Sequence, residues 1–139
     1  MRLANARLAL IYVTLMSSAL AQVGQADSKA AAEAHTIPIV DGGAGSCSAD
    51  FTITDNAGTS VYNAKIQVHV AYGFMYLHKL DLEVGTNVDG KARFVGLPSR
   101  TKNGLFFRAS EGEREGSAFD DPATTCKAKF TITLQKKSQ

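Results

Sequence analysis

The sequence predicts an all-β protein, a small β-sandwich, and three observations lead to that fold class. Beyond Cys47, apolar and polar residues alternate with a period of two in several short segments that are rich in β-branched residues. Clusters of Asp, Asn and Gly separate these segments, as turns separate strands. No long helical pattern interrupts them, and short strands with frequent turns are typical of a sandwich. A chain of 139 residues has the length of one domain.

Residues 1–21 have the pattern of a secretory signal peptide. A positively charged start is followed by a short apolar core at residues 8–16 and by the small-x-small pattern of residues 19–21. This apolar core is too short for a transmembrane anchor, which needs about 20 residues. We therefore expect cleavage after Ala21, with Ala26 as the second candidate, and a secreted or periplasmic protein. No later stretch is long and apolar enough to span a bilayer, so we expect no stable membrane insertion after cleavage.

The charge balance argues against nucleic-acid binding. The chain carries 15 Lys and Arg against 13 Asp and Glu, a net charge of +2. Cleavage removes Arg2 and Arg7, which leaves 13 basic residues against 13 acidic ones. A nucleic-acid-binding domain carries a basic patch or stripe. Here the basic residues cluster only at the C-terminal end, where we interpret them as a solvated strand edge and tail: Lys127, Lys129, Lys136 and Lys137.

Residues 22–45 are predicted to be a flexible lead-in. Ala30 to Ala34 could form one or two helical turns, which are marginal in water on their own. Gly42 to Gly45 is glycine-rich, but a phosphate-binding loop needs a strand before it and a helix after it. A strand-like segment follows instead, so we reject that motif.

The sandwich domain is predicted to span residues 46–135, with a tail at 136–139. In residues 64–72 apolar side chains alternate cleanly with polar ones, which is typical of a half-buried strand. The same alternation predicts further strands at residues 47–54, 80–84, 92–95, 105–109 and 127–134. Turn residues at 55–58 and 87–90 separate them.

Cys47 and Cys126 are predicted to form one disulfide. Both lie in the exported part of the chain, where an even pair of cysteines indicates a bridge. The bridge would close a loop of about 80 residues, for which the loop-entropy model gives roughly 4–5 kcal/mol of stabilisation. A reactive thiol or a metal ligand is the alternative, but the chain has no C-x-x-C, and no His lies beside either Cys.

Two stretches of the sandwich region follow a known family pattern. Residues 53–68 follow V-T-D-x-x-G-x-P-V-x-G-A-x-V-x-V, with Ser60 in place of Pro and Asn63 in place of Gly. Residues 86–98 follow T-D-x-D-G-x-F-x-F-x-G-L-P, with Asn87 in place of Asp and Ala92 in place of the first aromatic residue. In these stretches the chain resembles the carboxypeptidase regulatory-like domains, whose fold is also described as carbohydrate-binding-like. The resemblance implies a seven-stranded antiparallel sandwich of the immunoglobulin-like or transthyretin-like type, and it implies no catalytic residues.

Tyr72, Phe74 and Tyr76 are the candidate ligand-binding residues. Three aromatic residues with a period of two would line one face of a strand. If that face is exposed, it is a stacking platform for sugar rings or a protein-binding patch. If it is buried, the rings belong to the core. Tyr72 continues the apolar face of its strand, which favours the core, and the absence of Trp weakens the sugar interpretation.

Histidines and acidic residues are the candidates for metal or catalytic chemistry. His69 and His78 lie close in the sequence, but a zinc site needs several converging ligands, so we favour a solvated polar face for each. Residues 111–115 with Asp120 and Asp121 offer carboxylates for Ca²⁺, yet a solvated hairpin is the favoured interpretation. The chain contains no G-x-S-x-G. We expect no metal, no cofactor and no enzyme activity.

The sequence therefore predicts an exported, non-enzymatic binding module of the carboxypeptidase regulatory-like type. Its partner would be a protein or a polysaccharide. One alternative is a carbohydrate-binding module, which requires Tyr72, Phe74 and Tyr76 to be exposed on a flat face. Another is a small secreted hydrolase, which requires His69 or His78 beside a carboxylate in a pocket. A sandwich could also serve assembly by presenting an edge strand to a partner.

Overall fold

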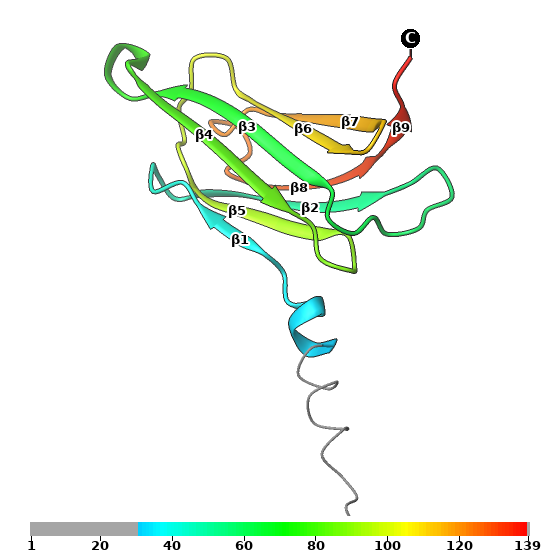
Figure 1. Ribbon diagram of the computed structural model, residues 1–139. Helices are drawn as coiled ribbons and strands as arrows, with labels where there is room; N and C mark the ends of the chain where they lie inside the picture. Colours follow the sequence, from blue (N-terminus) through cyan, green and yellow to red (C-terminus); the bar gives the residue numbers. More distant parts are fainter. Residues whose placement is uncertain (1–30, 139) are drawn as a thin grey trace, which may run out of the picture.

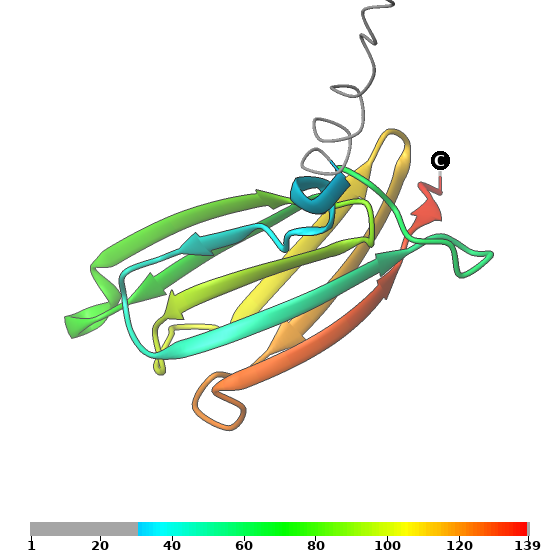
Figure 2. The same ribbon diagram turned by 90° about the horizontal axis from the view of Figure 1, so that it is seen from below.

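The computed structural model describes residues 31–138, and within them two β-sheets pack face to face (Figure 1). The view in Figure 2 shows the same two layers from below. The predicted all-β sandwich is confirmed, whereas the predicted signal peptide lies outside the described residues. No helix in the described part of the chain has the length and apolar character needed to cross a membrane.

Four strands form one sheet and five form the other. In sheet order, the first holds β1 (Ile39–Asp41), β5 (Lys91–Leu97), β2 (Cys47–Thr54) and β8 (Lys127–Thr133). The second holds β4 (His78–Gly85), β3 (Lys65–Tyr72), β6 (Leu105–Glu111), β7 (Arg114–Asp120) and β9 (Gln135–Lys136). The short 3₁₀ segment η1 (Phe74–Tyr76) joins β3 to β4, and residues 31–35 are helical.

The number and direction of the strands differ from the seven antiparallel strands that were predicted. The described residues form nine strands, and two pairs are parallel, β1 with β5 and β2 with β8. β1 lies in the predicted flexible lead-in, where a main-chain bond from Arg93 to the Pro38 carbonyl (2.9 Å) helps to hold it against β5. A strand of three residues is too short to show periodicity, so its sequence carries no strand signal.

Alternation along the strands fills the space between the sheets. Residues of β2 alternate between buried and half-buried, and those of β3 between exposed and buried, so each strand turns one face inward. The largest buried side chains are three phenylalanines. The ring of Phe51 lies edge-on to those of Phe94 and Phe107, with centroids 5.9 and 4.8 Å apart. Aromatic pairs in this geometry add to the hydrophobic stabilisation of a core.

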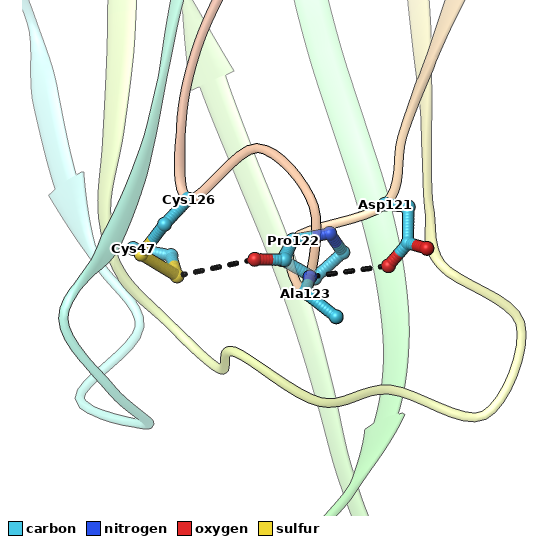
Figure 3. The surroundings of a disulfide bond; sticks show 5 residues. All are labelled: Cys47, Asp121, Pro122, Ala123 and Cys126. Carbon is cyan, nitrogen blue, oxygen red and sulfur yellow. Dashed lines mark hydrogen bonds between the residues drawn. A yellow bond between two sulfur atoms is a disulfide. The ribbon is translucent and has the colours of Figure 1, made fainter.

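The predicted disulfide between Cys47 and Cys126 is confirmed. It joins the first residue of β2 to the residue that precedes β8, and the adjacent Ser48 N–H donates to the Cys126 carbonyl (2.8 Å). Figure 3 shows the loop before Cys126, in which Asp121 accepts a hydrogen bond from the Ala123 N–H (3.1 Å). The Pro122 carbonyl oxygen lies 3.9 Å from the sulfur of Cys47. The bridge thus fastens two strands and one loop at a single end of the sandwich.

The two stretches that carry the family pattern meet in space. The Thr86 hydroxyl donates to the Val61 carbonyl (2.6 Å) and accepts from the Ala64 N–H (2.9 Å). Gly90 has a φ of 71°, and a Cβ there would lie 2.4 Å from the Ile53 carbonyl oxygen. Only glycine fits a left-handed position with so little space. The turn between β4 and β5 is therefore locked against the end of β2.

The two ends of the sandwich carry different features. The β3–β4 turn, the β5–β6 loop and the disulfide share one end, because Tyr72 bridges to Thr101 and Cys47 pairs with Leu97. The helical residues 31–35 and β9 lie at the opposite end (Figure 1).

Candidate functional site

The outer face of the five-stranded sheet carries a shallow hollow across β4, β3 and β6. Its cavity volume is about 510 Å³. A neighbouring hollow of about 450 Å³ extends over β7, and the two share Gln67, Phe106 and Arg108. The first hollow is lined by both polar and apolar side chains: Gln67, Val68, His69, Asp81, Leu82, Glu83, Phe106 and Arg108. We take this face as the candidate functional site because it combines hollows, rings and fixed polar groups.

Two exposed phenylalanines are cross-strand partners on this face, with the ring of Phe106 beside Arg108 and that of Phe119 over Gly104. Phe106 of β6 pairs with Phe119 of β7 in the antiparallel register, and their side chains are 49% and 58% exposed. Phe106 faces outward because its neighbours Leu105 and Phe107 are both buried, and successive residues of a strand alternate between its faces. The guanidinium carbon of Arg108 lies 5.9 Å from the centre of the Phe106 ring, which fixes a cation–π contact.

Cross-strand pairs hold the polar side chains of the hollow in place. The amide of Gln67 donates to the carboxylate of Glu83 (2.6 Å), directly across the β3–β4 register. Two register positions further on, Nδ1 of His69 contacts a carboxylate oxygen of Asp81. The side chains of His69 and Asp81 are 60% and 78% exposed. These groups present hydrogen-bond donors and acceptors in a fixed arrangement beside the rings.

The structure corrects the arrangement predicted for Tyr72, Phe74 and Tyr76. They do not share a strand face, because β3 ends at Tyr72 and the chain turns at Gly73, whose φ is 77°. Tyr72 is half-buried against the core, with its ring 5.5 Å from that of His78. Phe74 and Tyr76 belong to η1 and are exposed at the end of the sandwich. Aromatic residues at every second position also occur in this turn, so the sequence pattern alone wrongly predicted that the three rings share one strand face.

The rings of the sheet face, Phe106 and Phe119, were missed from the sequence, although a signal was present. Phe106 and Phe107 are consecutive in a strand, so one of the two rings must face away from the core. The acidic segment at residues 111–115 forms the predicted hairpin between β6 and β7. Arg114 lies at its turn, 2.5 Å from Glu111.

His35 lies far from the hollow and has its own carboxylate partner. His35 lies 2.8 Å from the carboxylate of Asp89, at the end of the sandwich opposite the β3–β4 turn. Among residues 31–138, no three His, Cys, Asp or Glu side chains converge as a metal site would require.

Three solved structures illustrate what the fold is similar to. The 3-chlorocatechol 1,2-dioxygenase of Rhodococcus opacus 1CP is 14% identical, with a TM-score of 0.46 over 73% of this chain and 64% of that one. The catechol 1,2-dioxygenase of Acinetobacter radioresistens is 16% identical, with a TM-score of 0.44 over 76% and 60%. That of Acinetobacter sp. ADP1 is 14% identical, with a TM-score of 0.42 over 73% and 59%. This chain therefore spans less than two thirds of each of these structures. No family model and no curated protein matches the chain.

Proposed function

We propose that this protein is an exported, non-catalytic binding module of the carboxypeptidase regulatory-like type that binds a saccharide on the outer face of its five-stranded sheet. The observation that carries the proposal is the pair Phe106 and Phe119, two exposed aromatic residues that are cross-strand partners on a sheet face that also holds polar groups. The disulfide and the hydrogen-bonded turns of the family pattern support the export and the family parts of the proposal.

The chemistry of the face suits a sugar. A pyranose ring has an apolar C–H face, which loses contact with water when it stacks on an aromatic ring. Its hydroxyl groups donate and accept hydrogen bonds at the ring edge. Glu83 and Asp81 offer acceptors, and Arg108 offers donors, all within the hollow that borders Phe106. The carbohydrate alternative thus moves from Tyr72, Phe74 and Tyr76 to the sheet face.

Binding to a panel of polysaccharides tests the proposal. The wild-type protein should be retained by at least one of them. Phe119→Ala and Phe106→Ala should each weaken that binding roughly tenfold, because each removes a stacking ring. Tyr62→Ala is the matched control, since Tyr62 is 64% exposed in the turn between β2 and β3 and lies off this face.

Two outcomes would contradict the proposal. The first is a panel that retains none of the wild-type protein. The second is retention that survives both phenylalanine variants unchanged, which would move the binding surface elsewhere.

One observation favours a second candidate function, a hydrolase. His69 stands beside the carboxylate of Asp81 at the rim of the hollow, which is the geometry of a base held by an orienting group. Incubation with each retained polysaccharide distinguishes the two functions. A binding module leaves the number of reducing ends unchanged, whereas a hydrolase raises it and loses that activity in His69→Ala.

A further inference from the structure

The turn between β3 and β4 exposes four large apolar side chains in succession. We call residues 73–77 the finger. Within it Phe74 is 79% exposed, Met75 72%, Tyr76 44% and Leu77 72%. Apolar side chains that gather at one exposed place on a soluble protein mark an interaction site.

The backbone of the finger adopts unfavourable conformations. Met75 and Tyr76 have φ values of 51° and 56°, in the left-handed region that side chains other than glycine disfavour. Gly73 also has a positive φ, and a Cβ there would lie 2.5 Å from the His78 ring. Only two main-chain bonds close the turn, from Tyr76 to Gly73 (3.0 Å) and from Leu77 to Phe74 (3.2 Å). Backbone of this kind is concentrated at functional sites.

Cationic side chains surround the base of the finger. Lys79 pairs in register with Ala71, whose carbonyl also accepts the Lys102 N–H (3.0 Å), and Arg100 lies two residues before Lys102. All three basic side chains are exposed, and none forms an ion pair with a described residue. The two segments that carry them, residues 71–80 and 98–105, contain no Asp or Glu.

The acidic residues at the same end of the sandwich lie outside these two segments, and the first along β4 is Asp81, which contacts His69. The carboxylate of Asp121 accepts the Ala123 N–H, and that of Asp41 accepts the Gly43 N–H (2.8 Å). Asp120 is only 7% exposed. The finger and the segments at its base therefore combine an apolar tip with three basic residues and no acidic residue within residues 71–80 and 98–105.

The finger stands at one extremity of the molecule. In Figure 1 the turn that joins β3 to β4 projects beyond the layers, and Figure 2 shows it at the same end from another side. The helical residues 31–35 and β9 lie at the opposite end. The tip can therefore touch a planar surface without obstruction from the rest of the described chain.

We propose that the finger docks reversibly on the surface of a lipid bilayer that contains anionic lipids. Phe74, Met75 and Leu77 enter the boundary of the acyl chains, and Tyr76 lies at the level of the headgroups, where amphipathic rings are favoured. Lys79, Arg100 and Lys102 contact the lipid phosphates. This peripheral docking is distinct from membrane spanning and goes beyond the proposed saccharide binding, because it uses another end of the molecule.

A bilayer suits the finger better than a folded protein partner does. A standard protein–protein interface draws on roughly 20 or more residues from each side. The finger offers four apolar residues on a convex turn, which is too little for such an interface. A bilayer presents an apolar interior below a negatively charged layer, and this order matches the apolar tip and the cationic base.

A single tryptophan reports the docking, because the chain has no native Trp. The full chain is prepared as Phe74→Trp and, as a matched control, as Tyr62→Trp at the opposite end of the sandwich. With vesicles of phosphatidylglycerol and phosphatidylcholine, the emission of Phe74→Trp should shift to shorter wavelength and be quenched by brominated acyl chains. Tyr62→Trp should show neither change. Both variants share residues 1–30, so any binding through that segment is common to them.

A pair of charge variants tests the cationic base. Lys79→Gln/Lys102→Gln should weaken partition onto the anionic vesicles about thirtyfold, since each basic residue near such a surface strengthens partition about fivefold. Lys91→Gln/Lys136→Gln removes the same charge at the other end and should change partition less than twofold. Vesicles of phosphatidylcholine alone should bind the wild type weakly and should not separate the two variants.

Three outcomes would overturn the inference: an unchanged Phe74→Trp emission with anionic vesicles, an equal shift in Tyr62→Trp, or equal losses in the two charge variants. An unchanged emission would favour a protein partner for the finger in place of a bilayer. The variants Phe106→Ala and Phe119→Ala should partition like the wild type, so a failure of saccharide binding and a failure of lipid docking are separately visible.

Discussion

The side-chain amide nitrogen of Asn87 lies 3.0 Å from the carbonyl oxygen of His35 and 3.2 Å from that of Thr36. Through these bonds the β4–β5 turn holds the segment that precedes β1. The oxygen of the same side chain accepts the N–H groups of Asp89 and Lys91. The family pattern has Asp at this position, and Asp could serve the two acceptor bonds but not the two donor bonds.

Asn87→Asp should therefore release the segment before β1 while keeping the turn. A carboxylate would face two carbonyl oxygens, so we expect a loss of about 1–2 kcal/mol in the free energy of unfolding, measured by urea denaturation. Hydrogen exchange of the Val88 N–H, which bonds to the Ala34 carbonyl, should accelerate. Asp89→Asn, which removes only the negative charge from the exposed pair with His35, should change stability by less than about 1 kcal/mol. Equal effects of the two variants would refute this role of Asn87.

The disulfide should supply a large share of the stability. Cys47 and Cys126 are separated by 79 positions, and for a loop of that length the loop-entropy model gives about 4.5 kcal/mol. We expect Cys47→Ala/Cys126→Ala to lower the free energy of unfolding by up to that amount. Chemical denaturation of the wild type under reducing conditions should give a similar value. A loss below about 1 kcal/mol in both experiments would contradict the expectation.

A single buried hydroxyl should be dispensable. The Oγ1 atom of Thr101 is buried and has no hydrogen-bond partner among the described residues. An unsatisfied polar atom costs free energy, and valine has the same shape without the hydroxyl. Thr101→Val should raise the free energy of unfolding by about 1 kcal/mol, and Thr101→Ser, which keeps the hydroxyl, should not. A destabilised Thr101→Val would show that the hydroxyl has a partner in solution.

Stability should depend on pH through Asp120. Burial, together with the neighbouring charge of Asp121, raises the pKa of Asp120 above its usual 3.8. The folded state therefore binds a proton more tightly than the unfolded state, so Asp120 reduces stability as the pH rises above about 4. Asp120→Asn cannot ionise and should be more stable than the wild type at pH 7, with the difference vanishing below pH 4. Thermal melts across this range measure it, and a constant difference would exclude the titration of Asp120 as the cause.

Substitutions at two adjacent residues of β6 should have different effects, one on the stability of the fold and the other on saccharide binding. Phe107 is fully buried, so Phe107→Ala should cost about 3–5 kcal/mol. Phe106 is half exposed, and Phe106→Ala should change stability by no more than about 0.5 kcal/mol. Thermal melts of both variants test this contrast. A large loss in Phe106→Ala would mean that its weaker saccharide binding reflects unfolding.

The sequence was sufficient to predict the core residues of the strands and the disulfide. Inward-facing residues such as Ile66, Val68 and Val70 follow a period of two, and all three are buried. The pairing of Cys47 with Cys126 followed from their number and context. The first inference rests on the alternation of side chains along a strand, and the second on the presence of only two cysteines in the chain.

The surfaces were harder to predict, for identifiable reasons. The sequence of the finger alternates as the sequence of a strand does. The left-handed conformations of Met75 and Tyr76, which end the strand pattern, are visible only in the structure. The pairing of Phe106 with Phe119 depends on the register of β6 and β7, which no single strand encodes. β7 contains Gly116 and Ser117 and no β-branched residue, so its strand propensity is low.

The parallel pairing of β2 with β8 has a kinetic consequence. Ser48 and Lys127 are partners across 79 positions, so closing this ladder requires a long stretch of chain to be ordered at once. Contacts of such high sequence separation make folding slow. In an oxidised chain the Cys47–Cys126 disulfide already holds Ser48 and Lys127 close together in the unfolded state. This long-range contact therefore does not have to form during folding. Refolding from the oxidised unfolded state should accordingly be much faster than from the reduced state.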